Sequence, residues 1–533
     1  MESTPAPVVE SAAPPGHSAI DSLGKGTVIL IIGTMLLLLL NFISRVAVAR
    51  HLSLEEFGDF NLGLSLAGLL SLVALLGLHQ AVARTIAERP DPAIRTKLIR
   101  WTAVVTVFAS VATSVIVYLA AEPIASLFNR SNPGELTVVF QMFSVTIGLT
   151  LLCTFIASIF QGFEDTFPFG VLNQGVQPAS FLVFVLVVFY YHLSLPAVLL
   201  AWVVSNVVTF GSLLIYAWLK LPQHLPKAAP AKHLPPGLWI LSLSLWGVTT
   251  LMFVTGFADT LILGVFRPEQ DVGVYSALMT LARLIMIAAG AVTYIFLPVT
   301  ARLAGEKNYE EIRKTYVTAG RWVLIFTVPM FLVFGLLPTE SLVWVFGSSY
   351  ASGSSALLIV TGAALVSVAF GPVNAALAGL AMTRPLLFAT AVSAISNVVL
   401  SFTLIPTYGL IGAAVAWAVA RVLYPAAGMF ALNTTHGIHP LRRNYVLPLV
   451  VSLVVGIPLF VGIRFVHHPD WVVLPLYFVG VAIFILAILL TRSVEEGDLF
   501  IVRMAEKVIG RPLPRVRHFL ERFLPPTALR PLA

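Results

Sequence analysis

Two charged residues lie deep inside long apolar runs of the sequence, where charges are rare. Arg283 stands near the middle of the run 272–299, and Asp259 lies at comparable depth in the run 238–266. Ionisable side chains inside membrane spans are costly and almost always face a wet interior. A guanidinium in such a place can hold a phosphate or diphosphate through two parallel hydrogen bonds. The alternative is a structural ion pair with Asp259, and both roles hold if the anion displaces Asp259 from Arg283 during the working cycle.

Two more arginines fall within apolar runs, and each is matched with an asparagine. Arg45 follows Asn41 by four residues, so both share one face of a helix. We expect this face to line the same wet interior, although an arginine near a helix end can also extend to the membrane surface. Arg421 and Asn206 are 215 residues apart, a spacing that recurs elsewhere in the chain. These two residues are expected either to face the interior or to join neighbouring helices by hydrogen bonds.

An amide cluster opens the run 169–191. Asn173, Gln174 and Gln177 stand at positions i, i+1 and i+4, which is partly one-sided on a helix. Amides in this arrangement suit the hydroxyl groups of a sugar. They also hydrogen-bond neighbouring helices, so a structural role stays open.

The chain around these residues has the composition of a membrane protein. Of its 533 residues, 58% are hydrophobic and 11% are charged, whereas an ordinary globular domain is roughly 25% charged. So few charges cannot coat a water-soluble surface of this length. Soluble enzymes and free nucleic-acid binders are excluded, and no nucleic-acid partner is expected.

Fourteen apolar runs are long enough to cross a bilayer, which takes about 20 residues in a helix. Their expected limits are 27–49, 58–80, 99–121, 136–160, 169–191, 195–219, 238–266, 272–299, 320–340, 355–381, 386–406, 409–432, 446–467 and 470–491. The runs are continuous and do not alternate with polar residues, which indicates helices and not a transmembrane barrel. The predicted fold is an all-α polytopic membrane protein with fourteen transmembrane helices.

The basic residues are sorted between the two sides of these runs. Of 32 Lys and Arg, 25 fall on the side of the amino terminus, four fall on the opposite side and three lie within runs. Cytoplasmic loops carry the positive excess. Both termini are therefore predicted to be cytoplasmic, with the protein in the cell membrane, and the net charge of +7 mainly reports this orientation.

Three short segments recur at nearly one spacing. The matched pairs are 56–60 with 271–275 at an offset of 215, 162–168 with 379–385 at 217, and Ala201-Trp202 with Ala416-Trp417 at 215. An even number of helices separates the repeats, so two six-helix lobes run parallel and are related by an axis along the membrane normal. Parallel repeats with a substrate site between them are typical of alternating-access transporters.

The repeat sets the expected domain boundaries. These are a disordered cytoplasmic tail (1–24), an N-lobe (25–219), a cytoplasmic linker (220–237), a C-lobe (238–432), two added helices (433–491) and a basic cytoplasmic tail (492–533). Within the last tail, residues 494–523 mix Arg and Lys with Leu, Ile and Phe at helical spacing. This pattern predicts a partly amphipathic helix on the anionic membrane surface.

Several motifs stand in order along the chain. They are GKG at 24–26, ARHLSLEEFG at 49–58, GL at 77–78, AR at 83–84, Gly379 with Thr383 and Pro385, and IPTYGLIGAA at 405–414. Together, with fourteen spans, they resemble the polysaccharide exporter branch of the multidrug/oligosaccharidyl-lipid/polysaccharide (MOP) flippase superfamily over roughly residues 22–491. The resemblance implies a flippase that carries a lipid-linked oligosaccharide or polysaccharide repeat unit from the cytoplasmic to the outer leaflet. The sugar and its phosphate would occupy a central cavity.

The resemblance also carries expectations about partners and coupling. It implies a polyprenyl phosphate carrier, undecaprenyl in bacteria or dolichyl in archaea, surrounding membrane lipids, and glycosyltransferases or a polymerase of the same pathway. The family's arginine on its first helix favours a cavity position for Arg45. No cofactor is implied. Asp259, with Asn397 and Ser401 on one face of the run 386–406, loosely resembles the sodium site of some lipid II flippases, so coupling to Na⁺ or H⁺ is an expectation.

Three other functions compete with this one. A flippase for the peptidoglycan precursor lipid II also has fourteen spans. A cation-coupled multidrug antiporter of the same superfamily would have twelve spans and an acidic residue in the first, but the run 27–49 has none. A membrane glycosyltransferase would use carboxylates such as Glu55, Glu56 and Asp59. The echo of their segment at 271–275 favours a tight turn with acids at a helix start, so no enzymatic activity is expected.

Overall fold

A computed structural model describes residues 38–89, 91–130, 132–192, 194–225, 237–466, 469–493 and 514. All regular secondary structure within these residues is helical. The predicted disordered tail 1–24, most of the predicted linker and all but Pro514 of the predicted amphipathic segment 494–523 lie outside the described residues.

The first half of the chain forms helices that match the first six predicted runs. They are a helix described over 38–51, α2 (Leu54–Leu75), α3 (Leu78–Glu88), α4 (Pro92–Leu119), α5 (Ala121–Ala125), α6 (Pro133–Gly162), the π-helix η1 (Pro168–Val176), α7 (Gln177–Tyr190) and α8 (Leu195–His224). The first predicted run, 27–49, is described only from residue 38. The helix α8 continues to His224, beyond the predicted start of the linker at 220.

The second half matches the other eight runs. Its elements are α9 (Leu238–Phe266), α10 (Glu269–Gly305), α11 (Tyr309–Leu336), α12 (Pro338–Phe346), the 3₁₀ helix η2 (Ser348–Gly353), α13 (Ser354–Ala369), α14 (Val373–Gly379), α15 (Thr383–His436), α16 (Arg443–Ile463), the 3₁₀ helix η3 (Asp470–Val472) and α17 (Val473–Leu490). Ten helices within the described residues are long and apolar enough to cross a membrane, or eleven when the bent helix α9 counts as one span.

The 54-residue helix α15 contains two of the predicted spans. Gly409 interrupts it with φ 55° and ψ −126°, a conformation that side chains rarely adopt. The Ser393 hydroxyl donates to the Ala420 carbonyl at 2.8 Å, so the two parts lie side by side. With α10 and the partly described first helix, the fourteen predicted spans are all present as helices.

Three spans are interrupted where the sequence analysis expected continuous helices. The second, predicted at 58–80, breaks after Leu75 and continues as α3 to Glu88. The tenth, predicted at 355–381, breaks between α13 and α14, where Gly371 has φ 86° and precedes Pro372. The fifth begins as the π-helix η1. Hydrophobic length locates a span but contains no signal for these local backbone changes.

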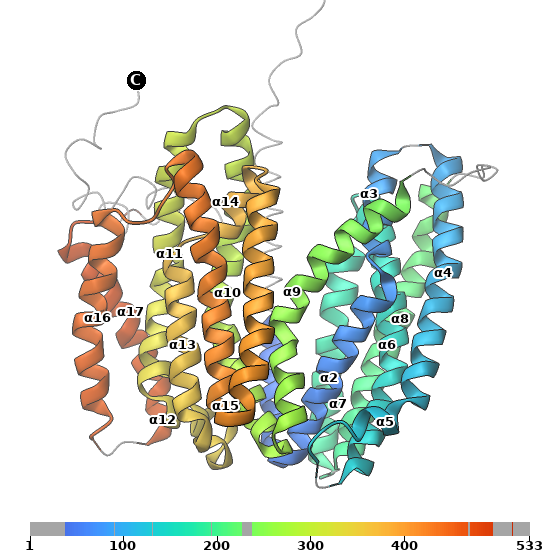
Figure 1. The fold of residues 1–533 in the computed structure, drawn as a ribbon, viewed down its shortest axis with the longest axis horizontal. Helices are drawn as coiled ribbons and strands as arrows, with labels where there is room; N and C mark the ends of the chain where they lie inside the picture. Colours follow the sequence, from blue (N-terminus) through green and yellow to red (C-terminus); the bar gives the residue numbers. More distant parts are fainter. Residues whose placement is uncertain are drawn as a thin grey trace, which may run out of the picture.

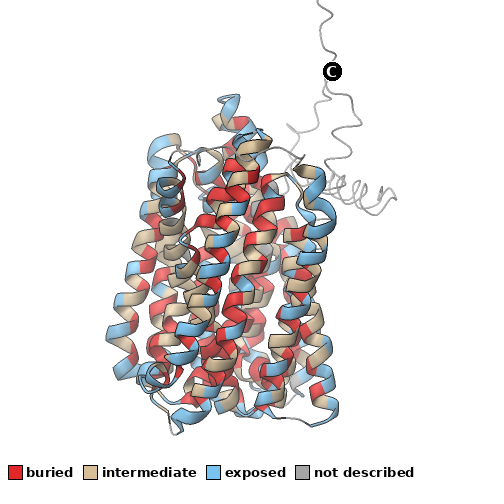
Figure 2. Cartoon of the chain, turned by 90° about the vertical axis from the view of Figure 1, so that its right-hand side faces the viewer, coloured by how far each residue is buried: buried red, intermediate tan, exposed pale blue. Residues whose placement is uncertain are grey.

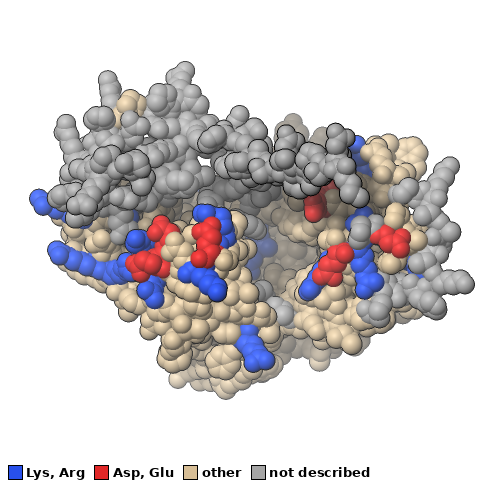
Figure 3. All heavy atoms as spheres, turned by 90° about the horizontal axis from the view of Figure 1, so that it is seen from above, with Lys and Arg blue, Asp and Glu red and all other residues tan. Residues whose placement is uncertain are grey.

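Figure 1 shows two groups of helices that lean together at one end and apart at the other. The group α2–α8 comes from the first half of the chain, and α10–α17 come from the second half. The helix α9 runs between them: it packs on α2 and α3 of the first half and on α15 of the second. It bends by 51° between Leu238–Leu251 and Phe253–Phe266. Viewed from the end that carries α3 and α14, the molecule is hollowed between the groups, with Lys and Arg on both rims (Figure 3).

At the opposite end the two halves meet through the repeated turn. A Cβ on Gly58 of α2 would overlap the carbonyl oxygen of Glu269, and a Cβ on Gly273 of α10 would overlap the carbonyl oxygen of Leu54. Residues 54 and 58 become 269 and 273 when the repeat offset of 215 is added. Each contact is therefore the symmetry mate of the other. The repeat found in the sequence closes this end of the molecule around a pseudo-twofold axis.

The outer surface of the helix bundle is apolar, as a lipid-facing surface must be. On α4, the exposed side chains include Val104, Phe108, Val111, Val115 and Leu119. Figure 2 shows the buried residues as stripes on the inward faces of the helices, with exposed residues on the outward faces. The polar groups that remain inside the bundle therefore need a separate explanation.

Candidate functional site

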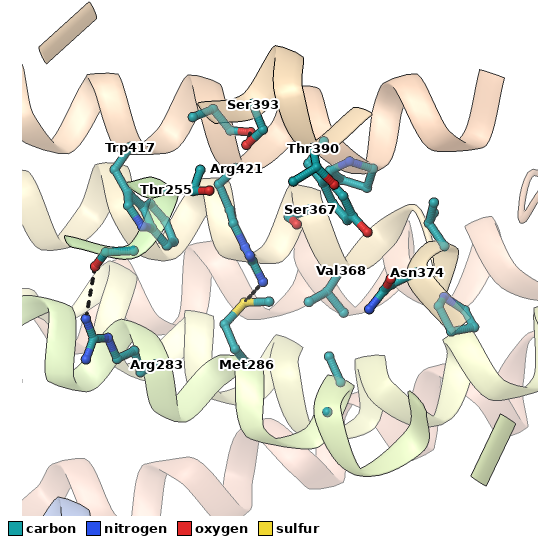
Figure 4. A pocket seen from close by; sticks show the side chains of 18 of the residues that line it. Thr255, Arg283, Met286, Ser367, Val368, Asn374, Thr390, Ser393, Trp417 and Arg421 are labelled. Carbon is teal, nitrogen blue, oxygen red and sulfur yellow. Dashed lines mark hydrogen bonds between the residues drawn. The ribbon is translucent and has the colours of Figure 1, made fainter. Parts of the chain in front are cut away.

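The main cavity lies within the second half of the chain and not midway between the halves. Its volume is about 590 Å³, and it is lined by residues of α9, α10, α11, α13, α14 and α15 (Figure 4). The bend in α9 accounts for this position. The first part of α9 leaves the second half to pack on the break between α2 and α3, where the Ser242 hydroxyl donates to the Leu76 carbonyl at 2.6 Å.

Arg283 lines this cavity from α10, which contains the predicted run 272–299. Its side chain is exposed and lines the main cavity together with Thr255 and Gly256 of α9. Its contacts are weak: one guanidinium nitrogen lies 3.4 Å from the Gly256 carbonyl oxygen, and the guanidinium carbon lies 5.3 Å from the Phe257 ring centroid. The cation thus lies in a cavity, and the described residues satisfy only a small part of its hydrogen-bonding capacity.

Arg283 also lines a second, smaller cavity that connects the two halves. This cavity includes Arg45 of the first helix and Asn61 of α2 on one side and Thr260 and Ser276 on the other. Arg45 donates to the side-chain oxygen of Asn61 at 3.3 Å. The structure therefore brings Arg283 and Arg45, which the sequence analysis predicted separately as cavity residues, to the wall of one cavity of about 20 Å³.

The predicted ion pair between Arg283 and Asp259 is not formed. Asp259 is fully buried in α9, where its carboxylate accepts hydrogen bonds from the Tyr275 hydroxyl at 2.5 Å and from the Thr260 backbone nitrogen at 2.8 Å. In the described part of the chain no ion pair within 4.0 Å joins Asp259 to Arg283. The Tyr275 hydroxyl, and not Arg283, donates the hydrogen bond to this carboxylate. Arg283 is therefore not held by Asp259 and is available to a ligand.

Arg421 enters the main cavity from α15 and is likewise poorly satisfied. Its closest partner is the sulfur of Met286 at 3.5 Å, and the Trp417 ring centroid lies 6.0 Å from its guanidinium carbon. Among the described residues, neither its Nε nor the nearby Tyr424 hydroxyl has a hydrogen-bond partner. The described lining of the cavity contains these two arginines and no Asp or Glu. Its electrostatic character is therefore cationic.

The comparison with known proteins identifies the family. A model described as polysaccharide biosynthesis protein matches residues 23–304, just over half of the 533 residues. The chain belongs to the polysaccharide biosynthesis protein family. A second family model, MatE, matches residues 247–403.

Individual relatives agree with this membership in the polysaccharide biosynthesis protein family. A "probable low-salt glycan biosynthesis flippase" of Haloferax volcanii is 24% identical over 181 residues, which are 34% of this chain and 36% of the relative. The match thus spans about a third of that relative's length.

Among solved structures, the lipid II flippase MurJ in an inward closed conformation superposes with a TM-score of 0.66 at 15% identity, covering 89% of this chain and 100% of that one. An inward-facing multidrug resistance MATE family transporter gives 0.62 at 16% identity, covering 75% and 96%. The fold is that of a MOP superfamily transporter.

Other predicted site residues of this family member lie away from both cavities. Asn206 is buried in α8 and donates to the Trp202 carbonyl of its own helix at 2.8 Å. Asn173 and Gln174 lie in η1, and Gln177 begins α7, where its amide nitrogen is buried without a partner. None of the four lines either cavity. Asn41, on the first helix with Arg45, is exposed and also absent from both linings.

The predicted cation ligands Asn397 and Ser401 are buried in α15, which packs against the helix of Asp259. Both side-chain amide atoms of Asn397 and the Ser401 hydroxyl lack hydrogen-bond partners within the described residues. Buried polar groups are nearly always satisfied. The Asn397 and Ser401 oxygens lie on a helix that packs against the helix of the buried Asp259 carboxylate. Oxygen atoms of this kind are the ligands that Na⁺ binds.

The sequence analysis missed several polar residues of the cavities, namely Asn61, Asn374, Thr390, Ser393 and Tyr424. Only Asn374 follows a visible signal, because it comes directly after the Gly371-Pro372 break. The others are ordinary polar residues of apolar helices. Their helices bring them together, and no local pattern distinguishes them from residues that pack against a neighbour.

Proposed function

We propose that this chain is a flippase that carries a lipid-linked oligosaccharide from the cytoplasmic to the outer leaflet of the cell membrane. The observation that supports it most is Arg283, a cation inside the membrane that lines both cavities and has no carboxylate within ion-pair distance among the described residues. An unpaired guanidinium at this depth is costly. A phosphate that enters the cavity neutralises the charge of Arg283. This attraction offsets the free energy that the phosphate loses when it leaves water.

The mechanism we propose is alternating access between two halves. One end is closed by α2 against α10, and the other is hollowed, with Lys and Arg beside Asp and Glu on its rims (Figure 3). We assign the hollowed end to the cytoplasm because 25 of the 32 Lys and Arg fall on this side in the sequence count, and cytoplasmic termini are part of this proposal. The glycan and phosphate would enter from this side, bind Arg283 and Arg45, and leave after the closed end opens.

The carrier in this proposal is a polyprenyl phosphate, undecaprenyl or dolichyl, whose tail stays in the bilayer while the polar head crosses. A hydrated sugar would otherwise lose several kcal/mol for each polar contact not replaced. Glycosyltransferases of the same pathway would deliver the substrate, and a polymerase or transferase on the outer side would use it. The described lining of both cavities has no acidic residue, which argues against a cation-exporting multidrug antiporter.

The test is genetic complementation combined with mass analysis of lipid-linked glycans. In cells that lack the gene, the substrate is expected to accumulate in the cytoplasmic leaflet, and its mass identifies it. Arg283→Ala should restore less than a tenth of the wild-type flux, and Arg283→Lys an intermediate amount, because an ammonium keeps the charge but not the bidentate geometry. Full rescue by Arg283→Ala would contradict the proposed role. Accumulation of lipid II itself would assign the chain to peptidoglycan synthesis.

We further propose that a cation drives the cycle through Asp259, Asn397 and Ser401. Sodium binding would satisfy the unpartnered oxygens of Asn397 and Ser401 and offset the Asp259 charge. In proteoliposomes an imposed Na⁺ gradient should raise flux severalfold, and Asn397→Leu should remove the increase. The exposed Thr403 of α15 provides the matched control, Thr403→Val, which should keep it. A response to a pH gradient alone would assign the coupling to H⁺, and indifference to both gradients would eliminate it.

A further inference from the structure

Arg421 marks a part of the main cavity that a single phosphate at Arg283 leaves unused. Its Nε and the Tyr424 hydroxyl are both buried, both line the cavity and both lack a hydrogen-bond partner in the described structure. Unsatisfied buried donors are rare and each one costs free energy. Two of them one helical turn apart, on the same face of α15, form a site that a ligand can complete.

The position of Arg421 is fixed relative to Arg283 by Met286. The guanidinium of Arg421 contacts the Met286 sulfur, and Met286 follows Arg283 by three residues on α10. Three helical residues correspond to a rise of about 4.5 Å. Because α10 runs from the closed end toward the hollowed end, Arg421 lies about one helical turn closer to the hollowed end than Arg283 does.

Figure 4 shows the polar groups in a row along the cavity, with Arg283 first, Arg421 next and Asn374 beyond it. Ser367 and Thr390 lie beside this row. The Asn374 amide and the Ser367 and Thr390 hydroxyls can hydrogen-bond the neutral hydroxyl groups of a sugar. Such neutral groups do not require a second arginine, because a charge held in the membrane without a counter-ion is far more costly than an amide.

We propose that Arg421 and Tyr424 form a second anion subsite, which binds a second negatively charged group of the head group, next to the phosphate held at Arg283. The proposal rests on the proposed function and adds a substrate class to it, a head group with at least two separate anionic centres. Two chemical sources supply such a group. One is the carboxylate of a sugar acid, and the other is the second phosphate of a diphosphate linkage.

The experiment measures binding of three synthetic probes to the purified full-length chain in detergent. They are farnesyl phosphate carrying a neutral glucose disaccharide, the same compound with glucuronic acid as its second sugar, and the neutral disaccharide on farnesyl diphosphate. Wild-type protein is expected to bind at least one doubly anionic probe about tenfold more tightly than the neutral monophosphate probe. The compound that gains affinity identifies the source of the second charge.

Single substitutions test which residues bind the second negative charge. Arg421→Gln should reduce the tenfold preference to about one, and Tyr424→Phe should reduce it about threefold. Arg283→Gln should weaken binding of all three probes, and Arg464→Gln, which removes an exposed arginine directly after α16, should change nothing. A preference that survives Arg421→Gln, or a wild type that binds all three probes equally, overturns the second subsite. If no probe binds the wild type, the proposed function fails instead.

Discussion

Replacing Gly58 or Gly273 with leucine is expected to reduce transport at least a hundredfold. A Cβ at Gly58 would overlap the backbone carbonyl of Glu269 and lie 3.1 Å from the backbone nitrogen of Gly273. The obstacle is backbone, which cannot rotate away as a side chain can. The leucine therefore separates α2 from α10 and prevents the closed end of the molecule from sealing.

The measurement combines flux in proteoliposomes with a crosslink that reports closure directly. The side chains of Glu55 and Gln270 meet at 2.9 Å on the pseudo-twofold axis. Cysteines at these two positions should therefore be joined by a short bifunctional thiol crosslinker in the parent protein. The crosslink should be lost when Gly58→Leu is added, while the protein still elutes as a single species.

Gly211→Leu in α8 is the matched control, because no atom lies within 4 Å of a Cβ placed there. It should transport and fold like the parent. Wild-type flux in the Gly58→Leu protein, or an undiminished crosslink, would show that the contact between α2 and α10 is not needed for the cycle.

The repeat that creates this contact was predictable, and so was the number of spans. Hydrophobic length identifies helices because every backbone polar group must be satisfied within the bilayer. The offset of 215 implied equivalent places for Gly58 and Gly273. It could not reveal that the two places touch, since contact depends on how the halves pack.

The candidate site was predictable in part, for the same physical reason. Membrane arginines are rare enough that Arg45, Arg283 and Arg421 stood out, and the structure brings all three to cavity walls. Of the two alternatives left open for Arg283, the ion pair with Asp259 is not formed in the described structure, because the Tyr275 hydroxyl donates to the Asp259 carboxylate. Asn206 illustrates a limit of repeats, since its equivalence to Arg421 did not place it at a cavity.

Carboxylates at the closed end show a second limit. Glu55, Glu56 and Asp59 could be read as catalytic acids, yet each has a structural partner. Glu55 accepts from Gln270, and Glu56 forms a capping box with Ser53 at the start of α2. Asp59 pairs with Arg130, a residue 71 positions away that no local pattern connects to it.

Replacing Arg130 with methionine is expected to destabilise the protein by about 3–5 kcal/mol, the usual cost of removing one partner from a buried ion pair. The Arg130 side chain is 1% exposed and lies 2.8 Å from the Asp59 carboxylate and 3.8 Å from that of Glu269. Without it, two carboxylates remain buried with no cation. Because Glu269 belongs to the second half of the chain, the loss should also weaken the closed end.

Heating the purified variants and following the fraction that stays monodisperse measures the effect. Arg84→Met is the matched control: it breaks the Arg84–Glu88 pair, whose side chains are 57% and 54% exposed. Exposed pairs contribute about 0–1 kcal/mol. Arg130→Met should therefore lower the midpoint far more than Arg84→Met does, and equal midpoints would contradict a buried role.

The decisive variant removes the charges together. Asp59→Asn and Glu269→Gln, added to Arg130→Met, leave no unpaired carboxylate and should recover most of the lost stability, because the penalty lies in the uncompensated charge and not in the absent ion pair. If the triple variant stays as unstable as Arg130→Met, the arginine acts through its hydrogen bonds to the Asn129 and Arg267 carbonyls. The triple variant distinguishes the two explanations, because neutralising Asp59 and Glu269 removes the uncompensated charge but does not restore the hydrogen bonds to the carbonyls.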